Sequence, residues 1–531
     1  MLYLNNMTKK KIENLLKKSS KILFKKLPQK IRVEYSPKKE YGDYSTNLPL
    51  ELAKEIKQDP LKIAQNILSQ ILKQKLNMFE KAEVKKPGFI NFFLKESYLQ
   101  KQVREIIKKE ENFGKLNLGK GGKANVEFIS ANPTGLLHIG NGRGAFFGDT
   151  LATILETVGY KVTREYYIND AKVSIQIQEL GKTALGKGTA YLTPSLKSLL
   201  QKLRPHLKTL KGESEAGYFL AQNIQANIQN FIKEKLKINF DRWSSEQNLY
   251  REDKVKKVFD YFSKKNLLYK KEGAWWLKTS EFGDTKDEVL IRKTGEPTYF
   301  LSDIAYHQDK IQRGYGKIID IWGADHQGHI KRMQAAMEML GYKGGFVVLI
   351  SQMVRLKSGK KLSKRKGEII ELNDLIKEVG LDVSRFFYLS KSLSSQMEFD
   401  LDLAKTEGEK NPVFYIQYAY VRAESILKKA KKLNFELPSY NLLKHPLELV
   451  LIRELIKLPE IIEDTSKDYQ LQRLPEYGRT LASAFHQFYR DCQVLNQDKK
   501  LSQNRLALVF ATKIVLKNLL SLMGISSPKR M

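Results

Sequence analysis

Cysteine is almost absent from this chain, since Cys492 is the single one in 531 residues. One cysteine cannot form an intramolecular disulfide, and it cannot supply the ligands of a cysteine-based zinc site. We therefore expect no protein-bound zinc and no metal-ligating residues.

Long apolar runs are also missing. The first 30 residues break their apolar positions into short groups, and the run 506–525 near the C-terminus is interrupted by Lys513 and Lys517. These two lysines lie one helical turn apart, so they would place charge inside a bilayer. The sequence therefore predicts no signal peptide and no membrane segment, and we expect a cytoplasmic protein.

Acidic residues are few relative to basic ones. Lys and Arg number 92 against 59 Asp and Glu, which gives a formal net charge of +33. Such an excess of positive charge causes repulsion within the protein unless a polyanion binds to it, which favours RNA or DNA as the partner. A general lysine bias of the genome explains the same total equally well, so the charge alone does not identify a partner.

The pattern of apolar residues divides the chain into three parts. Residues 1–113 combine helical periodicity with a strand-like segment at 89–94. From 379 to 531, apolar residues recur at three- and four-residue spacing, which predicts a helical bundle.

The central part, 114–378, begins with a glycine- and lysine-rich linker. Short β-branched runs then alternate with helical segments, which is typical of a parallel α/β sheet. These runs lie at 126–129, 318–322 and 346–350. The irregular, lysine-rich span of about 175–290 is interpreted as an insertion in the sheet domain.

A first candidate phosphate site lies in 125–144. The segment runs from a predicted strand through a Pro-Thr-Gly turn into a helix that we expect to begin near Gly140. This geometry directs free backbone N–H groups and the positive helix end at an anion. His138, just before the helix, can donate to negative charge that develops on a phosphorus. A tight turn with a satisfied histidine is the alternative.

A second candidate phosphate site lies about 220 residues later, at 353–367, where lysines and arginines gather in a glycine-bearing loop. Taken alone, this segment is also compatible with a solvated charge run or with a general RNA-binding patch.

A candidate substrate pocket lies between these segments in the sequence. Tyr299 and Asp303 are four residues apart, so on a helix they share one face. A carboxylate there can bind a guanidinium group with two hydrogen bonds, and the tyrosine can frame it. An ordinary helix face with one buried tyrosine is the alternative. His326 and His329 also allow a metal pair, but His307 is the only other histidine nearby in the sequence.

Together these motifs resemble those of class I aminoacyl-tRNA synthetases. The segment from Ser130 to Asn141 resembles the HIGH signature, with Asn141 where the second histidine stands, and Lys361-Leu-Ser-Lys-Arg is similar to the KMSKS loop. Asparagine can still donate one neutral hydrogen bond at that position. Glu127, Ser130 and Asn132 look like the arginyl version of the first signature.

The resemblance to arginyl-tRNA synthetases spans nearly the whole chain. Segments 40–47 and 86–92 resemble the extra N-terminal domain of that family, which is associated with the tRNA elbow. Segments 382–389, 399–405 and 411–422 resemble the start of its anticodon-binding domain.

The family implies an α/β fold with three domains: an α+β N-terminal domain at 1–113, a Rossmann-type parallel-sheet catalytic domain at 114–378 and an all-α helical bundle at 379–531. It also implies an arginine–tRNA ligase that uses ATP with Mg²⁺ to activate L-arginine and then transfers the arginine to tRNA(Arg). Enzymes of this family commonly activate arginine only when tRNA is bound. A monomer is the family default.

The resemblance also assigns roles to residues of this chain. The expected catalytic residues are His138, Asn141, Lys361 and Lys364. The expected ATP-binding residues are Gly140, Gly323, Asp325, His329, Met353 and Ser363. The expected arginine-binding residues are Glu127, Ser130, Asn132, Tyr299, Asp303 and Gln327. The expected tRNA-binding residues are Asn47, Tyr415, Tyr418 and Arg422.

Three other functions compete with this one. A nucleotidyltransferase with the same His-Ile-Gly turn would be shorter and would lack the basic helical part. A synthetase-like RNA-binding protein without activity should have lost His138, Lys361, Lys364 or Asp303, and all four are present. A class I synthetase for another amino acid is disfavoured by the acidic pocket positions.

Overall fold

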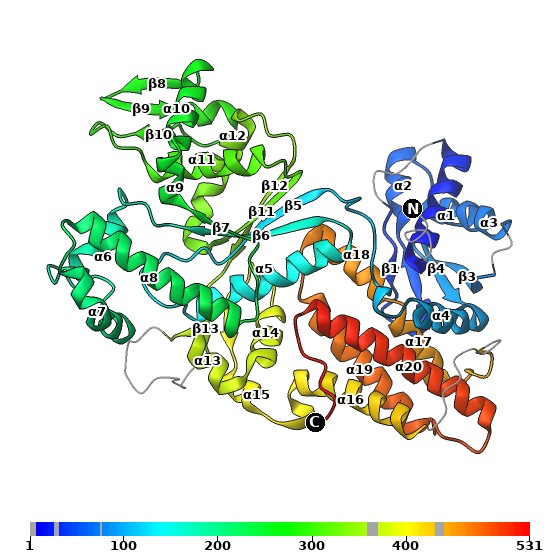
Figure 1. Ribbon diagram of the computed structural model, residues 1–531. Helices are drawn as coiled ribbons and strands as arrows, with labels where there is room; N and C mark the ends of the chain where they lie inside the picture. The colour runs from blue at the N-terminus through cyan, green and yellow to red at the C-terminus, as the bar shows by residue number, and fades with distance from the viewer. Residues whose placement is uncertain (1–6, 26–30, 75–76, 358–369, 431–439) are drawn as a thin grey trace. The chain divides into compact units, whose positions relative to one another are not determined.

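The computed structural model describes residues 7–25, 31–74, 77–357, 370–430 and 440–531. They form two compact units (Figure 1), the first built from residues up to 118 together with 407–469 and 473–531, and the second from 119–406 with 470–472. Among the helices of these ranges, none combines the length and the apolar character needed to cross a membrane.

The first unit combines a small antiparallel sheet with helices from both ends of the chain. Its sheet has the strand order β1-β2-β4-β3. The strands are β1 (Glu34–Tyr35), β2 (Tyr44–Thr46), β3 (Phe79–Lys85) and β4 (Phe89–Leu94). The N-terminal helices are α1 (Thr8–Phe24), α2 (Leu48–Ile56), α3 (Pro60–Leu72) and α4 (Glu96–Lys109). The C-terminal helices are α16 (Pro412–Lys429), α17 (Pro446–Leu455), α18 (Leu458–Asp468), α19 (Arg473–Asp491) and α20 (Lys499–Leu522).

Sequence periodicity predicted β4 and the helical character of the C-terminal part, but not β1, β2 or β3. The strand expected at 89–94 is β4, and the C-terminal run 506–525 is the core of α20, whose apolar residues are buried in the bundle. α16 starts where the side chain of Asn411 accepts the N–H of Val413 and Pro412 takes the first helical position, a pairing that satisfies a free helix-end donor.

One buried carboxyl group joins the N-terminal and C-terminal segments of the first unit. Glu460 on α18 is 1% exposed. Its oxygens accept hydrogen bonds from the backbone N–H of Lys9 (2.8 Å) and from the hydroxyls of Tyr35 (2.8 Å) and Tyr44 (3.1 Å). Burial raises the pKa of Glu460 to about 7, which these donors oppose.

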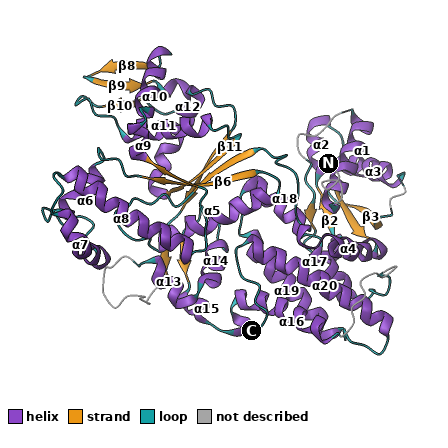
Figure 2. Ribbon diagram, in the orientation of Figure 1, coloured by secondary structure: helices purple, strands orange, loops and turns teal. Residues whose placement is uncertain are grey.

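The second unit is built on a five-stranded parallel sheet with the order β12-β11-β5-β6-β7 (Figure 2). Its strands are β5 (Lys123–Glu127), β6 (Lys161–Ile168), β7 (Arg242–Ser245), β11 (Lys317–Gly323) and β12 (Gly345–Ser351). α5 (Ile139–Thr157) packs on β5 and β6, while α11 (Tyr299–Gln312) and α12 (Ile330–Met339) cover the other face. The expected α/β class with a Rossmann-type parallel sheet is confirmed.

The span of about 175–290 is not one insertion. It includes β7, a strand of the main sheet, so two separate segments flank that strand. The first holds α6 (Ile175–Ala184), α7 (Pro194–Leu207) and α8 (Glu213–Glu234). The second holds α9 (Glu246–Arg251), α10 (Lys254–Lys264) and an antiparallel sheet of β8 (Leu268–Lys271), β9 (Ala274–Leu277) and β10 (Glu288–Ile291). β7 escaped detection because Arg-Trp-Ser-Ser is short and polar.

The second unit closes with a strand at the start of the lysine-rich loop and with elements that follow this loop. These are β13 (Val354–Leu356), α13 (Leu372–Val379), α14 (Leu381–Leu389), β14 (Met397–Phe399) and α15 (Leu401–Lys405). α14 and α15 thus lie in the unit of the sheet, whereas the sequence analysis placed them in the helical domain. The two domain boundaries expected after residues 113 and 378 stay predictions.

A strand ends earlier than its apolar run predicts. β5 stops at Glu127, because Ile129 and Ser130 have positive φ angles of 68° and 38°. Such angles are costly for a β-branched residue and incompatible with a strand. The chain turns there and enters α5 at Ile139, close to the start predicted at Gly140.

Glycine lets α5 approach this strand closely. A Cβ atom added to Gly148 would lie 2.2 Å from Cγ of Phe128, whose side chain is fully buried.

We predict that Gly148→Ala lowers the free energy of unfolding by about 1–2 kcal/mol, because overpacking outweighs the roughly 1 kcal/mol that alanine gains in a helix. Chemical denaturation measures this change. Gly345→Ala is the control, since its Cβ meets nothing within 4 Å; equal stability of the two variants would contradict the packing argument.

Candidate active site

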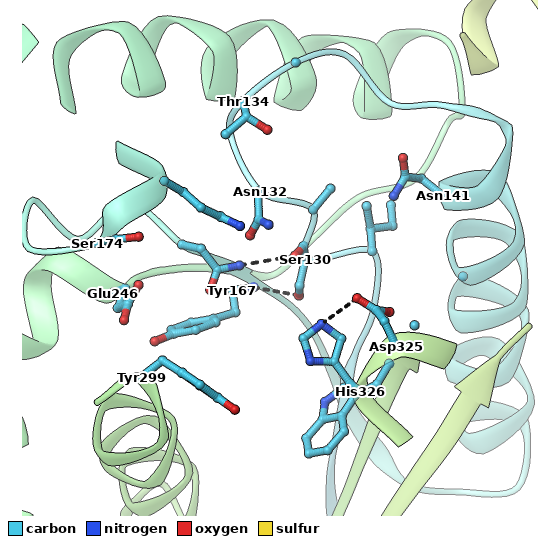
Figure 3. A pocket seen from close by; sticks show the side chains of 18 of the residues that line it. Ser130, Asn132, Thr134, Asn141, Tyr167, Ser174, Glu246, Tyr299, Asp325 and His326 are labelled. Atoms are coloured by element: carbon cyan, nitrogen blue, oxygen red, sulfur yellow. Dashed lines mark hydrogen bonds and ion pairs between the residues drawn. The ribbon is translucent and has the colours of Figure 1, made fainter. Parts of the chain in front are cut away.

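A cavity of about 2180 Å³ lies at the carboxyl ends of the parallel strands. Its lining includes Glu127 at the end of β5, Tyr167 of β6, Glu246 after β7, Trp322 of β11 and Met353 after β12. In a parallel sheet these strand ends share one edge, which is where ligands of open α/β folds bind. Residues far apart in the sequence therefore meet around one space (Figure 3).

The first phosphate motif forms the start of α5. Nδ1 of His138 accepts the N–H of Gly140 at 3.0 Å, and Oδ1 of Asn141 accepts the N–H of His138 at 2.9 Å. The pair caps the helix reciprocally. Asn141, which replaces the second histidine of the signature, therefore has a role in fixing the helix end.

The same contacts define the proton on His138. Desolvation by the surrounding protein lowers the pKa of His138, so the ring is neutral at pH 7. Because Nδ1 accepts a hydrogen bond, the proton resides on Nε2. His138 lines the cavity, so it can donate a neutral hydrogen bond to a phosphate there without adding a full charge.

The lysine-rich loop begins and ends at this cavity. On one side Met353 lines it and is 55% exposed. On the other side the backbone of 370–372 pairs with the segment of His138, through Ile139 N–H to Ile370 C=O (3.0 Å) and Leu372 N–H to Leu137 C=O (2.8 Å). Lys361, Ser363 and Lys364 lie outside the described residues.

The segment after β11 supplies a further wall. Gly323, Asp325 and His329 line the cavity, whereas Gln327 is exposed and is not part of the lining. A Cβ at Gly323 would lie 2.5 Å from Oδ1 of Asp325, so the exposed Asp325 side chain would have to move if this glycine were replaced. The structure thus brings the expected nucleotide-binding residues of this segment together but does not bring Gln327 to them.

The two histidines of this wall form no metal centre with their neighbours. The rings of His326 and His329 are 5.7 Å apart, and His326 pairs with Asp325 at 3.4 Å. Across the part of the chain that the structure describes, no group of three His, Cys, Asp or Glu side chains is placed to hold a metal ion. Nδ1 of His329 lies 2.9 Å from the hydroxyl of Tyr299.

The opposite end of the cavity is acidic and aromatic. Glu127, Glu246 and Asp303 line it, and the rings of Tyr167 and Tyr306 stack beside them at 4.1 Å. In Figure 3, Glu246, Tyr167 and Tyr299 lie together on one side, away from Asn141. The hydroxyls of both stacked tyrosines are buried and have no hydrogen-bond partner within the described structure.

Glu246 is a candidate that the sequence analysis missed. It follows the polar strand β7, and its side chain accepts a hydrogen bond from Ser302 at 2.7 Å on α11. Glu246 could have been placed at a strand end with Glu127 only if β7 had been recognised as part of the main sheet.

Burial makes these carboxyl groups difficult to ionise. The pKa of Asp303 lies well above its usual range, because burial and the nearby carboxylates of Glu246 and Glu127 oppose its charge. Burial likewise raises the pKa of Glu246 and that of Glu127. A cation in the cavity would favour ionisation of all three groups, so this arrangement fits a positively charged ligand.

The expected tRNA-binding residues lie in the first unit. On α16, the guanidinium group of Arg422 lies 4.4 Å from the ring centre of Tyr418 and 4.7 Å from that of Tyr489. Arg422 also donates to the hydroxyl of Tyr418 at 2.7 Å, and Tyr415 contacts the ring of His486 at 4.7 Å. These four rings form a cluster at the surface of α16 and α19.

Asn47 lies just before α2 and donates to Glu51 at 3.3 Å. The roles of Asn47, Tyr415, Tyr418 and Arg422 in RNA binding stay predictions.

Comparison with known proteins yields one consistent result. Family models match three parts of the chain: the arginyl tRNA synthetase N terminal domain at 6–94, the class I (R) tRNA synthetase catalytic domain at 194–391 and the DALR anticodon binding domain at 416–531. The arginine–tRNA ligase of Desulforamulus reducens is 40% identical over 526 residues, which cover 94% of this chain and 93% of that protein.

Other relatives agree over similar lengths. The arginine–tRNA ligase of Moorella thermoacetica is 38% identical and covers 97% of this chain and 96% of its own. The solved structure of Thermus thermophilus arginyl-tRNA synthetase is 21% identical, with a TM-score of 0.82 and coverage of 99% of this chain and 100% of that chain; this last likeness shows the fold.

We predict that Asp303→Asn stabilises the ligand-free protein at pH 8. Because the pKa of Asp303 is raised, the folded state binds its proton more tightly than the unfolded state does. Asp303 therefore lowers the free energy of unfolding at pH 8, where the unfolded state is ionised. The neutral side chain should raise the free energy of unfolding by about 0.5–2 kcal/mol. The gain should shrink as the pH falls towards the ordinary pKa of aspartate, as chemical denaturation at several pH values would measure.

Asp309→Asn on the same helix is the matched control. Although burial opposes its charge, contacts with Lys254 and Arg313 lower the pKa of Asp309. The same substitution there should destabilise the protein at pH 8. If Asp303→Asn and Asp309→Asn lowered the free energy of unfolding equally, burial of the Asp303 charge would not destabilise the protein.

Proposed function

The chain belongs to the arginyl-tRNA synthetase family of class I aminoacyl-tRNA synthetases, and from this premise we propose that the cavity described above joins arginine to tRNA. The enzyme is an arginine–tRNA ligase. In the first step a carboxylate oxygen of L-arginine attacks the α-phosphorus of ATP, the bond to pyrophosphate breaks, and arginyl-adenylate forms. In the second step a hydroxyl of the terminal ribose of tRNA attacks the arginyl carbonyl, and AMP leaves.

One observation carries this assignment: a capped helix start and an acidic pocket share a single cavity. The helix start, with His138 and the backbone N–H groups of α5, suits the phosphates of ATP. The acidic end suits the side chain of arginine. The α-phosphorus and the amino-acid carboxylate then meet between them, as the first step requires.

The acidic end accounts for the choice of amino acid. Asp303 and Glu246 accept the N–H groups of the guanidinium, whose fixed fork suits a carboxylate. Glu127 and Asn132, which line the same cavity, bind the α-ammonium group of the amino acid. An apolar amino acid would leave the buried carboxyl groups of Asp303 and Glu246 without a cation, so the cavity rejects leucine and valine.

The nucleotide lies against the opposite wall. Gly140 and Gly323 allow ATP to approach the backbone, and Asp325 accepts from ribose hydroxyls. Nε2 of His138 donates to the phosphates, and Lys361 and Lys364 neutralise the charge of the departing pyrophosphate. Mg²⁺ accompanies ATP and offsets phosphate charge.

The remaining partner is tRNA(Arg). The first unit contains the segment that matches the DALR anticodon binding domain, and the ring cluster of Tyr418 and Arg422 suits stacking on unpaired bases. Because tRNA is charged where proteins are made, we place the enzyme in the cytoplasm, and we propose that it acts as a monomer.

Aminoacylation of total tRNA, tested separately with each of the twenty amino acids, checks the assignment. Arginine should be charged and the other nineteen should not. Charging by a different amino acid would refute the proposal, and so would the absence of ATP–pyrophosphate exchange with arginine in the presence of tRNA.

Glu246→Gln tests the acidic pocket. Loss of one carboxylate that faces the guanidinium should raise the KM for arginine about 10-fold or more, while the KM for ATP changes less than about twofold. Pyrophosphate exchange with tRNA present measures both constants. Glu281→Gln, at an exposed position of the same unit, is the control and should leave both constants unchanged. Parallel increases in both KM values would argue against a role of Glu246 in binding arginine.

A further inference from the structure

A buried ionic network lies directly beneath the acidic end of the cavity. Lys310 on α11 is 0% exposed, and its ammonium group donates to Oε2 of Glu127 at 2.5 Å and to Oδ1 of Asp320 at 2.8 Å. The group also lies 4.4 Å from the ring centre of Tyr306. Lys310 does not line the cavity, and no step of the reaction uses it.

The network continues to the other acidic residue of the pocket. Nε2 of His307 lies 2.7 Å from Oδ2 of Asp320, and its Nδ1 lies 2.7 Å from the backbone carbonyl of Asp303. Lys310 is thus linked through short hydrogen bonds to Glu127 on β5 and, through Asp320 and His307, to the helix turn that carries Asp303.

The charge of Lys310 balances the carboxylates around it. Burial opposes that charge, yet Asp320, Glu127 and Glu165 raise the pKa of Lys310 above its ordinary value. In turn, burial raises the pKa of Glu127 and Lys310 opposes that rise. A buried carboxylate without its cation is strongly destabilised, so the ion pair with Lys310 favours the charged form of Glu127 and holds its carboxylate in one orientation.

Glu127 holds the strained turn that leads into the active site. Ile129 and Ser130 have φ angles of 68° and 38°, which are strained for residues other than glycine and persist only where neighbours fix them. Oγ of Ser130 donates to Oε1 of Glu127 at 2.9 Å and accepts the N–H of Tyr167 at 3.0 Å. The next residues include Asn132, which lines the cavity.

We propose that Lys310 is a positioning residue for arginine, a role that rests on the proposed function. Lys310 fixes Glu127, Glu127 fixes the Ile129–Ser130 turn through the hydroxyl of Ser130, and the turn presents Asn132 to the amino acid. Without the ammonium group, the turn relaxes towards ordinary backbone angles and the arginine-binding groups move, whereas the nucleotide wall at Gly323 and Asp325 is unaffected.

Lys310→Met tests this role by pyrophosphate exchange with tRNA present. The kcat/KM for arginine should fall about 10²-fold, as expected for a displacement of binding groups, while the KM for ATP stays within about twofold. The fraction of active enzyme, measured by active-site titration, should stay near that of the parent. A merely structural lysine would instead lower the active fraction and leave both KM values unchanged, which would overturn the proposal.

Lys254→Met is the matched control. Lys254 on α10 pairs at 2.9 Å with Asp309, which lies on α11 next to Lys310. Among the contacts of the described residues, Lys254 does not bind Glu127. This variant should keep the arginine kcat/KM within about twofold of the parent. An equal loss in both variants would show that any ion pair on α11 has this effect, and the specific role of Lys310 would be refuted.

A double variant keeps the test valid if Lys310→Met does not fold. Lys310→Met/Asp320→Asn removes one positive and one negative charge, so the buried charges stay balanced, and the same selective loss for arginine is expected. A folded double variant with the arginine KM of the parent would overturn the proposal. A parent protein that shows no arginine-dependent exchange would refute the proposed function itself, so the two failures can be told apart.

Discussion

One cavity at the carboxyl edge of the parallel sheet contains groups that attract an anion and groups that attract a cation. The start of α5 attracts anions, and Glu127, Glu246 and Asp303 attract a cation. A parallel sheet brings these groups together because all of its strands end at the same edge. The ligands are a polyanion and a cationic amino acid, so each end of the cavity is complete only when its ligand is bound.

This arrangement costs stability in the empty protein. Asp303 and Glu246 are buried with raised pKa values, so their charged forms are unfavourable without a nearby cation. A guanidinium group bound beside them would remove this cost. Selectivity therefore comes largely from the penalty of leaving these groups unpaired, which a ligand without a positive side chain cannot remove.

The buried network below the cavity explains how such a site is kept in shape. Lys310 supplies a cation that remains in place whether or not arginine is bound. It allows a strained turn next to β5 to persist, and it connects that turn with α11 through Asp320 and His307. The two walls that hold the amino acid are thus joined through the core of the sheet.

Local features of the sequence were sufficient for the motifs near a single helix or strand. The start of α5 at His138, the strands at 318–322 and 346–350, and the shared helix face of Tyr299 and Asp303 follow from spacing and residue type, since each depends on neighbours within one or two turns. The family and its activity also followed from the sequence, because the two signatures and the flanking domains are contiguous segments.

Contacts between distant segments could be known only from the tertiary structure. Glu246 reaches the pocket because a polar strand joins the sheet, Gln327 lies outside the cavity lining although its neighbours are in it, and Glu127 is paired with Lys310, 183 residues away. Buried charges are stable only with partners that the fold brings to them. The identity of those partners is a property of the packed sheet and helices, which no local pattern of residues encodes.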